Sequence, residues 1–229
     1  MILPNDSDLK PVLTREIWER LSDSPALQEA ETVRCGVEPW YWLVNYVYTI
    51  RRDENTNTSS VERFPADEYL RYVYHKCFVE PELAIDKSRQ MRMTWIMMAY
   101  ELWNAQFNQN ELITCQTKKE KDADEELIKR AYFMWKSQPG WLKPEAKRSF
   151  CRLEFPAQNS LILGIPNGGD QIRSHNPSRH LGDECGFLEG EFEDCRTAAL
   201  ACCKDIKLIS TANGGLWDDF INDKIEDAA

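Results

Sequence analysis

The fold is decided by the stretch Leu83-Ala-Ile-Asp-Lys-Ser-Arg-Gln-Met-Arg-Met-Thr94, which continues as Trp95-Ile-Met-Met-Ala-Tyr100. Leu83–Ile85 is a short apolar run, typical of a buried strand. From Thr94 to about Phe107, apolar residues lie on nearly every side of the expected helix, so this helix should be deeply buried. The residues between the two form a polar, basic turn. A buried strand that leads through such a turn into a buried helix indicates an α/β fold.

The chain after residue 107 continues this alternation of strand and helix. We expect strands over Leu112–Cys115, His180–Asp183 and Ile206–Ser210, a hairpin over Arg152–Phe155 and Ser160–Gly164, and helices over Asp122–Trp135 and Phe192–Cys203. The pattern predicts a mostly parallel central sheet with helices on both faces. Ligands of such sheets bind at the carboxyl ends of the strands.

The first third of the chain has a different character. Residues 14–34 predict one or two surface helices, with Thr14 as a cap. The aromatic stretch 39–48 predicts a buried helix or strand. The polar residues 53–62 predict a surface loop, and Phe64-Pro65 opens another helix. We therefore expect an N-terminal helical segment over residues 1–35, followed by the main domain over 36–229.

Composition limits the function classes. The 229 residues carry a net charge of −10, which disfavours a general polyanion binder but leaves local contacts with DNA open. The eight cysteines contain no C-x-x-C pair and no histidine at zinc spacing, so reduced, mostly buried thiols are expected. There is no secretory signal and no long apolar run, so we expect a soluble intracellular protein without membrane contact.

Three strand ends carry side chains suited to phosphate chemistry. In the first, Lys87, Arg89, Arg92 and Thr94 supply cations and a hydroxyl next to a helix N-terminus. The turn does not match G-x-x-x-x-G-K-[ST], because it has no glycine and Met93 stands before Thr94. A basic surface turn is the alternative interpretation.

The other two strand ends are acidic and hydroxylic. Asp183-Glu184 is suited to holding Mg²⁺ and orienting a water, or it is a solvated acidic pair. Ser210-Thr-Ala-Asn213, before Gly214-Gly215, is suited to sensing a γ-phosphate, or it is a turn into a last helix.

Taken in order, these segments resemble a known family. Lys87–Thr94, Cys115-Gln-Thr117, Asp183-Glu184 and Ile209–Gly214 look like the ATPase half of the terminase large subunit of tailed bacteriophages. Asn45–Ile50 and Phe64–Leu70 resemble the same family, so the similarity covers roughly residues 36 to 222. The resemblance implies a P-loop NTPase (ASCE-like) fold that binds ATP and Mg²⁺, with residues 36–229 as the motor domain.

The resemblance also implies roles for individual residues. Lys87 would start a deviant Walker A loop, Thr94 and Asp183 would hold the metal, and Glu184 would be the catalytic glutamate. Arg89 would act near the γ-phosphate, and Arg173 would be an arginine finger for a neighbouring subunit. The whole loop would contact the nucleotide: Lys87, Ser88, Arg89, Gln90, Met91, Arg92, Met93 and Thr94. The coupling motif would be Ser210, Thr211, Ala212 and Asn213.

Several positions depart from the family pattern. Arg92 stands where glycine is common, and Asp67-Glu68 where a glutamine often reads adenine. Tyr46 or Tyr69 would stack on adenine or belong to the core. The family's nuclease half has no counterpart up to Ala229, and the acidic residues after Asp218 are expected to form a solvated tail.

The implied function is Mg-dependent ATP hydrolysis that powers the translocation of double-stranded viral DNA into a procapsid. The implied partners are double-stranded DNA, the portal and the small terminase subunit. A homo-oligomeric ring in the host cytoplasm is expected when assembled, and a monomer for the isolated domain. The alternative is a non-hydrolysing assembly module with a degenerate nucleotide loop, docking to the portal or the small subunit.

Overall fold

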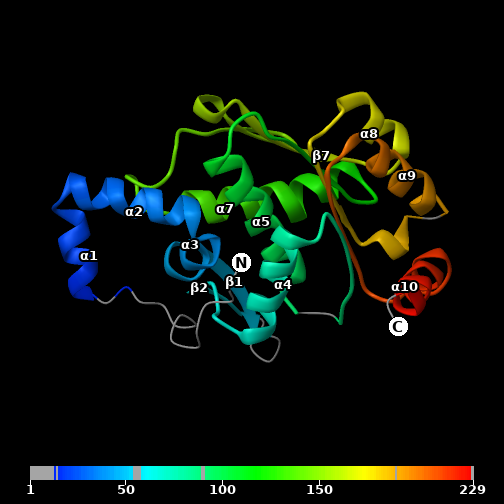
Figure 1. Cartoon of the computed structure of the whole chain (residues 1–229), viewed down its shortest axis with the longest axis horizontal. Helices are drawn as coiled ribbons and strands as arrows, with labels where there is room; N and C mark the ends of the chain where they lie inside the picture. Colours follow the sequence, from blue (N-terminus) through cyan, green and yellow to red (C-terminus); the bar gives the residue numbers. More distant parts are fainter. Residues whose placement is uncertain (1–12, 14, 54–57, 89–90, 189, 228–229) are drawn as a thin grey trace. The chain divides into compact units, whose positions relative to one another are not determined.

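The computed structural model describes residues 13, 15–53, 58–88, 91–188 and 190–227 (Figure 1). The chain divides into two compact units, residues 1–75 with 133–144 and residues 76–132 with 145–229. The division between residues 35 and 36 stays a prediction. Within the described ranges, each helix is too short or too polar to cross a lipid bilayer.

The first unit begins with helices α1 (Arg15–Ser22) and α2 (Pro25–Val37). The hydroxyl of Ser24 accepts a hydrogen bond from the Leu27 N–H at 3.4 Å, and Pro25 occupies the first helical position, where its missing N–H costs nothing. The prediction of one or two helices in this region is confirmed, and there are two. The proposed cap Thr14 lies outside the described residues.

Helix α3 (Pro39–Tyr46) forms the aromatic core of this unit. Trp42 and Tyr46 are fully buried, and the Tyr46 ring meets the rings of Trp18 and Trp141 edge-on, with centroids 5.6 Å away in both cases. The Tyr46 hydroxyl donates to Glu31 Oε1 at 2.6 Å, the kind of partner that a buried phenol needs. This burial confirms the core alternative for Tyr46. Tyr69, on helix α4 (Glu68–Val79), is 40% exposed.

A two-stranded antiparallel hairpin follows, formed by β1 (Tyr48–Asp53) and β2 (Thr58–Arg63). The prediction of a surface loop over residues 53–62 is therefore wrong for residues 58–62. The first four residues of β2 are exposed. Because neither face of this part of the strand is buried, its sequence lacks the alternation of apolar and polar residues that signals a strand.

The second unit is built on a seven-stranded sheet in the order β3-β9-β8-β4-β7-β6-β5. Five neighbouring strands are parallel, and β6 and β5 are added antiparallel to β7. The strands are β3 (Glu82–Asp86), β4 (Leu112–Gln116), β5 (Lys147–Ser149), β6 (Arg152–Phe155), β7 (Ser160–Ile165), β8 (Arg179–Asp183) and β9 (Asp205–Ser210). The mostly parallel sheet and each predicted strand are confirmed, and the short edge strand β5 is an addition.

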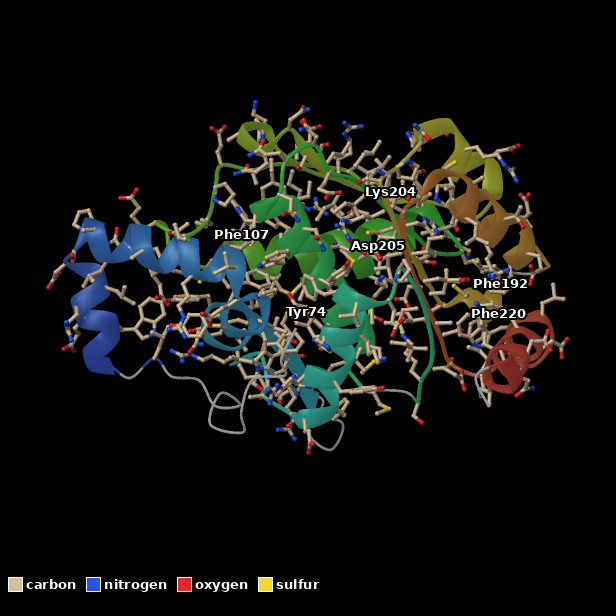
Figure 2. The ribbon with its side chains drawn as sticks, viewed as in Figure 1. Tyr74, Phe107, Phe192, Lys204, Asp205 and Phe220 are labelled. Atoms are coloured by element: carbon tan, nitrogen blue, oxygen red, sulfur yellow. The ribbon has the colours of Figure 1, made fainter. Side chains whose placement is uncertain are left out.

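One face of this sheet packs against α8 (Gly169–His175), α9 (Phe192–Cys202) and α10 (Leu216–Asp227). In Figure 1 these helices are yellow to red, and in Figure 2 Phe192 and Phe220 lie together, with ring centroids 5.3 Å apart. Trp217 and Phe220 bury α10 in this cluster. The predicted tail after Asp218 is therefore a helix rather than an irregular segment, while Asp219 and Asp223 are exposed, as predicted.

The opposite face packs against α5 (Met93–Phe107) and the π-helix η2 (Ala123–Ile128). In the chain, η2 follows the short helix α6 (Glu120–Asp122) and precedes α7 (Lys129–Lys136). A Cβ on Gly164 of β7 would lie 3.1 Å from Ala123 Cβ and 3.2 Å from Ile128 Cγ1, so this glycine permits the close approach of η2. Helices on both faces are confirmed. The helix predicted over 122–135 is present, with an unpredicted change of winding.

A network of charged side chains lies at the amino ends of the strands. Lys207, fully buried, pairs with Asp205 and donates to the Glu80 carbonyl at 2.7 Å. Arg179 pairs with Asp205 and with Glu111. Glu101 of α5 is 1% exposed, and neither carboxylate oxygen has a hydrogen-bond partner among the described residues. Burial, and then the nearby Asp205 carboxylate, raise the pKa of Glu101 to about 8.

We expect Glu101→Gln to stabilise the protein increasingly as the pH rises from 5 to 8. The unfolded chain loses the Glu101 proton near pH 4.5, whereas the folded chain keeps it until about pH 8, so folding takes up a proton in this range. The parent therefore loses stability with rising pH by about 1 kcal/mol per pH unit from this group, and the variant does not. Urea unfolding at several pH values measures the difference. The exposed Glu193→Gln is the control, and a difference that stays constant with pH would contradict the assignment.

All eight cysteines are free thiols, as expected. Six of them are buried, and Cys202 and Cys203, where α9 ends, are partly exposed. Burial raises the pKa of the Cys203 thiol to about 12.

Candidate functional site

The carboxyl ends of three neighbouring parallel strands bring the predicted segments together. Strand β9 lies between β3 and β8, and its last residue, Ser210, pairs with Asp86 at the end of β3. The Lys87 N–H donates to the Ser210 carbonyl at 2.8 Å. Asp183 ends β8, paired with Ile209 of β9. The phosphate-loop, acidic and coupling segments thus meet at one edge of the sheet.

The centre of the site is a contact among Lys87, Thr94 and Asp183. Lys87 Nζ lies 3.2 Å from Thr94 Oγ1 and 3.2 Å from Asp183 Oδ1, and the Thr94 hydroxyl donates to Asp183 Oδ2 at 2.9 Å. The Lys87 and Asp183 side chains are 12% and 6% exposed. Charges so shielded from water interact more strongly than a surface pair. Three residues singled out in the sequence, from positions far apart in the chain, therefore form one cluster.

The turn between Lys87 and Thr94 explains two departures from the usual loop. Met93, the first residue of α5, is 3% exposed and belongs to the core, so a lysine at that position would have to be buried. Arg92 has φ 57°, a left-handed conformation that favours glycine and costs other residues roughly 1–2 kcal/mol. Ser88 and Met91 are exposed. Arg89 and Gln90 lie outside the described residues.

The oxygen atoms of Thr94 and Asp183 fit a magnesium ion. A hydroxyl and a carboxylate are hard oxygen ligands, and Mg²⁺ is commonly held by one or two protein groups, with waters and phosphates completing its octahedron. Among the described residues, no group of three or more acidic, histidine or cysteine side chains is arranged to hold a metal. With Thr94 and Asp183 as ligands, most positions of an octahedral ion would be left for water or phosphate oxygens.

Glu184 follows Asp183 in a strained turn. It has φ 59°, and its N–H donates to Asp183 Oδ1 at 2.9 Å. This conformation turns the chain out of β8 into the 3₁₀ turn η4 (Cys185–Phe187), and the Glu184 residue is largely exposed. Partial desolvation of the carboxylate, and then the Asp183 charge, raise the pKa of Glu184. A carboxylate with a raised pKa is a better proton acceptor, as a general base requires.

The predicted coupling segment, residues 210–213, contacts η4 directly. Ser210 is fully buried, and its hydroxyl accepts a hydrogen bond from the Gly186 N–H and donates to the Thr211 carbonyl, each at 2.9 Å. The Asn213 side-chain amide donates to the Gly186 carbonyl at 2.9 Å. Thr211 is partly buried and Ala212 is exposed. Gly186 was not identified from the sequence, because nothing local marks it as a partner of residues 24 and 27 positions later.

Arg173 lies on α8, and its hydrogen-bond partners are not part of the Lys87–Thr94–Asp183 cluster. Its guanidinium donates to Asp170 at 2.9 Å and to Asp194 of α9 at 2.6 Å, and these bonds raise the pKa of Arg173. Asp194 also accepts the Gly169 N–H at 3.1 Å. The structure therefore gives the predicted arginine finger two carboxylate partners on its own chain. Asp194 is a residue that sequence reasoning missed.

The fold is similar to that of solved phage proteins. The crystal structure of the HK97 bacteriophage large terminase superposes with a TM-score of 0.63 over 84% of this chain, at 13% sequence identity. A point mutant of the ATPase domain of the large terminase of Thermus phage P74-26 matches over 61% of this chain and 63% of its own, with a TM-score of 0.44 and 12% identity. The match to the HK97 protein confirms the fold that the motifs implied.

The similarity covers part of the HK97 protein and is not matched by similarity in sequence. The chain spans 42% of the length of the HK97 protein. No family model matches the sequence, and no curated protein matches it.

Proposed function

We propose that this chain is the ATPase domain of a phage large terminase, which hydrolyses Mg-ATP to move double-stranded DNA into a procapsid. The observation that supports this most is the cluster of Lys87, Thr94 and Asp183, at the carboxyl ends of parallel strands in a fold like that of the HK97 large terminase. The carboxyl edge of a parallel sheet is where such folds bind ligands. The motor role rests on the fold likeness and on the order of the motifs together.

In this proposal, the Lys87 ammonium group gives up its ion pair with Asp183 and binds a phosphate of the nucleotide instead. Its ammonium group lies between Thr94 and Asp183, within reach of an anion at the N-terminus of α5. Thr94 and Asp183 would hold Mg²⁺, which would offset the negative charge of the β- and γ-phosphates. The remaining loop residues, Ser88 to Met93, would contribute backbone N–H groups to the phosphates.

Glu184 acts in the same proposal as the proton acceptor for the attacking water. Its exposed carboxylate and raised pKa suit this task. Arg173 would leave Asp170 and Asp194 to reach the nucleotide of a neighbouring subunit, and Arg89 would act near the γ-phosphate. Such arginines accelerate hydrolysis by roughly 10³ to 10⁵ in other NTPases. DNA, the portal and the small terminase subunit are the partners in a ring formed in the host cytoplasm.

Nucleotide binding tests the proposal directly. Isothermal calorimetry and thermal unfolding with a non-hydrolysable ATP analogue should show binding that depends on Mg²⁺. A hundredfold excess over Kd stabilises the fold by roughly 2.7 kcal/mol. Single-turnover assays at high protein concentration should then detect phosphate release, even where a partner arginine is missing.

The same experiment decides the second candidate, a non-hydrolysing assembly module. The observation that favours this candidate is the Lys87–Asp183 ion pair, together with arginine at the left-handed position of the loop. Absence of any nucleotide signal, with binding to the portal or the small subunit retained, would establish the module and exclude the ATPase.

A further inference from the structure

Gly186 occupies an unusual position two residues after Glu184. It is the middle residue of η4, and the Phe187 N–H closes this turn on the Glu184 carbonyl at 2.9 Å. Both backbone polar groups of Gly186 are bonded to side chains of the coupling segment, the N–H to Ser210 and the carbonyl to Asn213. The turn that follows Glu184 is thus fastened at one residue by two hydrogen bonds.

The space around Gly186 leaves little room for a side chain. A Cβ there would lie 3.0 Å from Ser210 Oγ, 3.4 Å from Asn213 Cβ and 3.4 Å from the Thr211 carbonyl oxygen. The Ser210 hydroxyl is the closest of these atoms, and its two hydrogen bonds fix its position. A Cβ at this position would therefore press on residues 210–213, and the closest of them would have to shift by a few tenths of an ångström.

Ser210 connects this turn to the phosphate loop. Its backbone carbonyl accepts the Lys87 N–H, while its side chain accepts the Gly186 N–H. A displacement of Ser210 would therefore move both Lys87, at the start of the loop, and the turn that follows Glu184. Buried hydrogen-bonded groups of this kind move together, because separating them leaves polar atoms unpaired.

We propose that Gly186 is a positioning residue for hydrolysis. Its hydrogen bonds with Ser210 and Asn213 connect the turn after Glu184 to the coupling segment, and they keep Glu184 in a fixed position relative to the phosphate loop. The inference rests on the proposed ATPase function and adds a residue to it. The catalytic group remains Glu184, and Gly186 acts through the turn.

Kinetics of Gly186→Ala test the proposal. We expect kcat in single-turnover assays to fall at least tenfold, with the Kd of the Mg-bound ATP analogue within a factor of two of the parent. A purely structural defect would instead lower the amount of folded protein without this split. The control is Gly140→Ala, because a Cβ at Gly140 has no atom within 4 Å. An unchanged kcat in Gly186→Ala would overturn the inference.

Hydrogen exchange supplies a readout without nucleotide. In Ser210→Ala the Gly186 N–H loses its acceptor, so the peptide that contains residues 184–188 should exchange at least tenfold faster than in the parent. Ser174→Ala, which removes an exposed hydroxyl on α8, should leave it unchanged. Unchanged exchange in Ser210→Ala would show that the contact does not hold the turn. If exchange is faster in Ser210→Ala but the parent protein binds no nucleotide, the contact is present, and its catalytic role is overturned together with the proposed function.

The effects of the two substitutions on kcat should also be less than additive. Gly186→Ala displaces the hydroxyl that Ser210→Ala removes, so the double variant should lose little more than the worse single variant. Fully additive losses would show that the two residues act independently and would contradict the proposal.

Discussion

Lys87→Ala is expected to abolish the Mg-dependent stabilisation of this protein by ATP analogues. Lys87 Nζ is nearly buried and lies 3.2 Å from both Thr94 Oγ1 and Asp183 Oδ1. Loss of a shielded, hydrogen-bonded charge contact to a bound phosphate would cost about 2–5 kcal/mol of binding free energy, which corresponds to a loss of affinity of roughly 30- to 4,000-fold. Calorimetry with the analogue measures the loss, and thermal unfolding confirms it.

Two control variants separate nucleotide binding from folding. Lys129→Ala removes a lysine that is 55% exposed and should bind as the parent does. Lys87→Arg keeps the positive charge beside Asp183, so it should fold with near-parental stability. If Lys87→Ala binds ATP with the parent's Kd, the phosphate-loop assignment is wrong.

Glu184→Gln is expected to bind Mg-ATP as tightly as the parent but to lower the rate of phosphate release by about 10² to 10⁴. The amide keeps the size of the side chain in the turn but does not accept a proton from water. Partial desolvation, and then the Asp183 charge, raise the pKa of Glu184, which favours proton uptake by this carboxylate. Single-turnover hydrolysis and calorimetry on the same preparation provide the two numbers.

The matched control for this variant is Glu193→Gln, at the exposed start of α9. Its turnover should equal that of the parent. Parental turnover in Glu184→Gln would remove this residue from the reaction, and weakened binding would assign it to nucleotide recognition instead.

The parts of the site that could be predicted from the sequence are those at strand ends. Lys87, Asp183 and Ser210 each follow a short apolar run, and a parallel sheet places such ends at one edge. The burial of Met93 also follows from the apolar character of α5 and accounts for the missing lysine before Thr94. Local pattern and sheet topology were sufficient for these residues.

Other features depend on contacts between distant residues, which a single sequence does not encode locally. Strand β2 has no buried face, so its sequence does not alternate between apolar and polar residues. The π-helical winding of η2 is not marked by any characteristic amino-acid composition. In the sequence, Gly186 is not distinguishable from the other nine glycines, because its contacts with Ser210 and Asn213 are formed only in the folded chain. Asp194, one of the two partners of Arg173, likewise lies on a neighbouring helix.

The distribution of the thiols has a practical consequence for spectroscopy. Thiolates, rather than thiols, react with maleimide dyes, so the raised pKa of Cys203 leaves Cys202 as the favoured attachment point near neutral pH. Cys202 precedes the amino end of β9, whereas Lys87 lies at the carboxyl edge of the same sheet. A fluorophore attached to Cys202 would therefore label the chain at the opposite end of the sheet from Lys87.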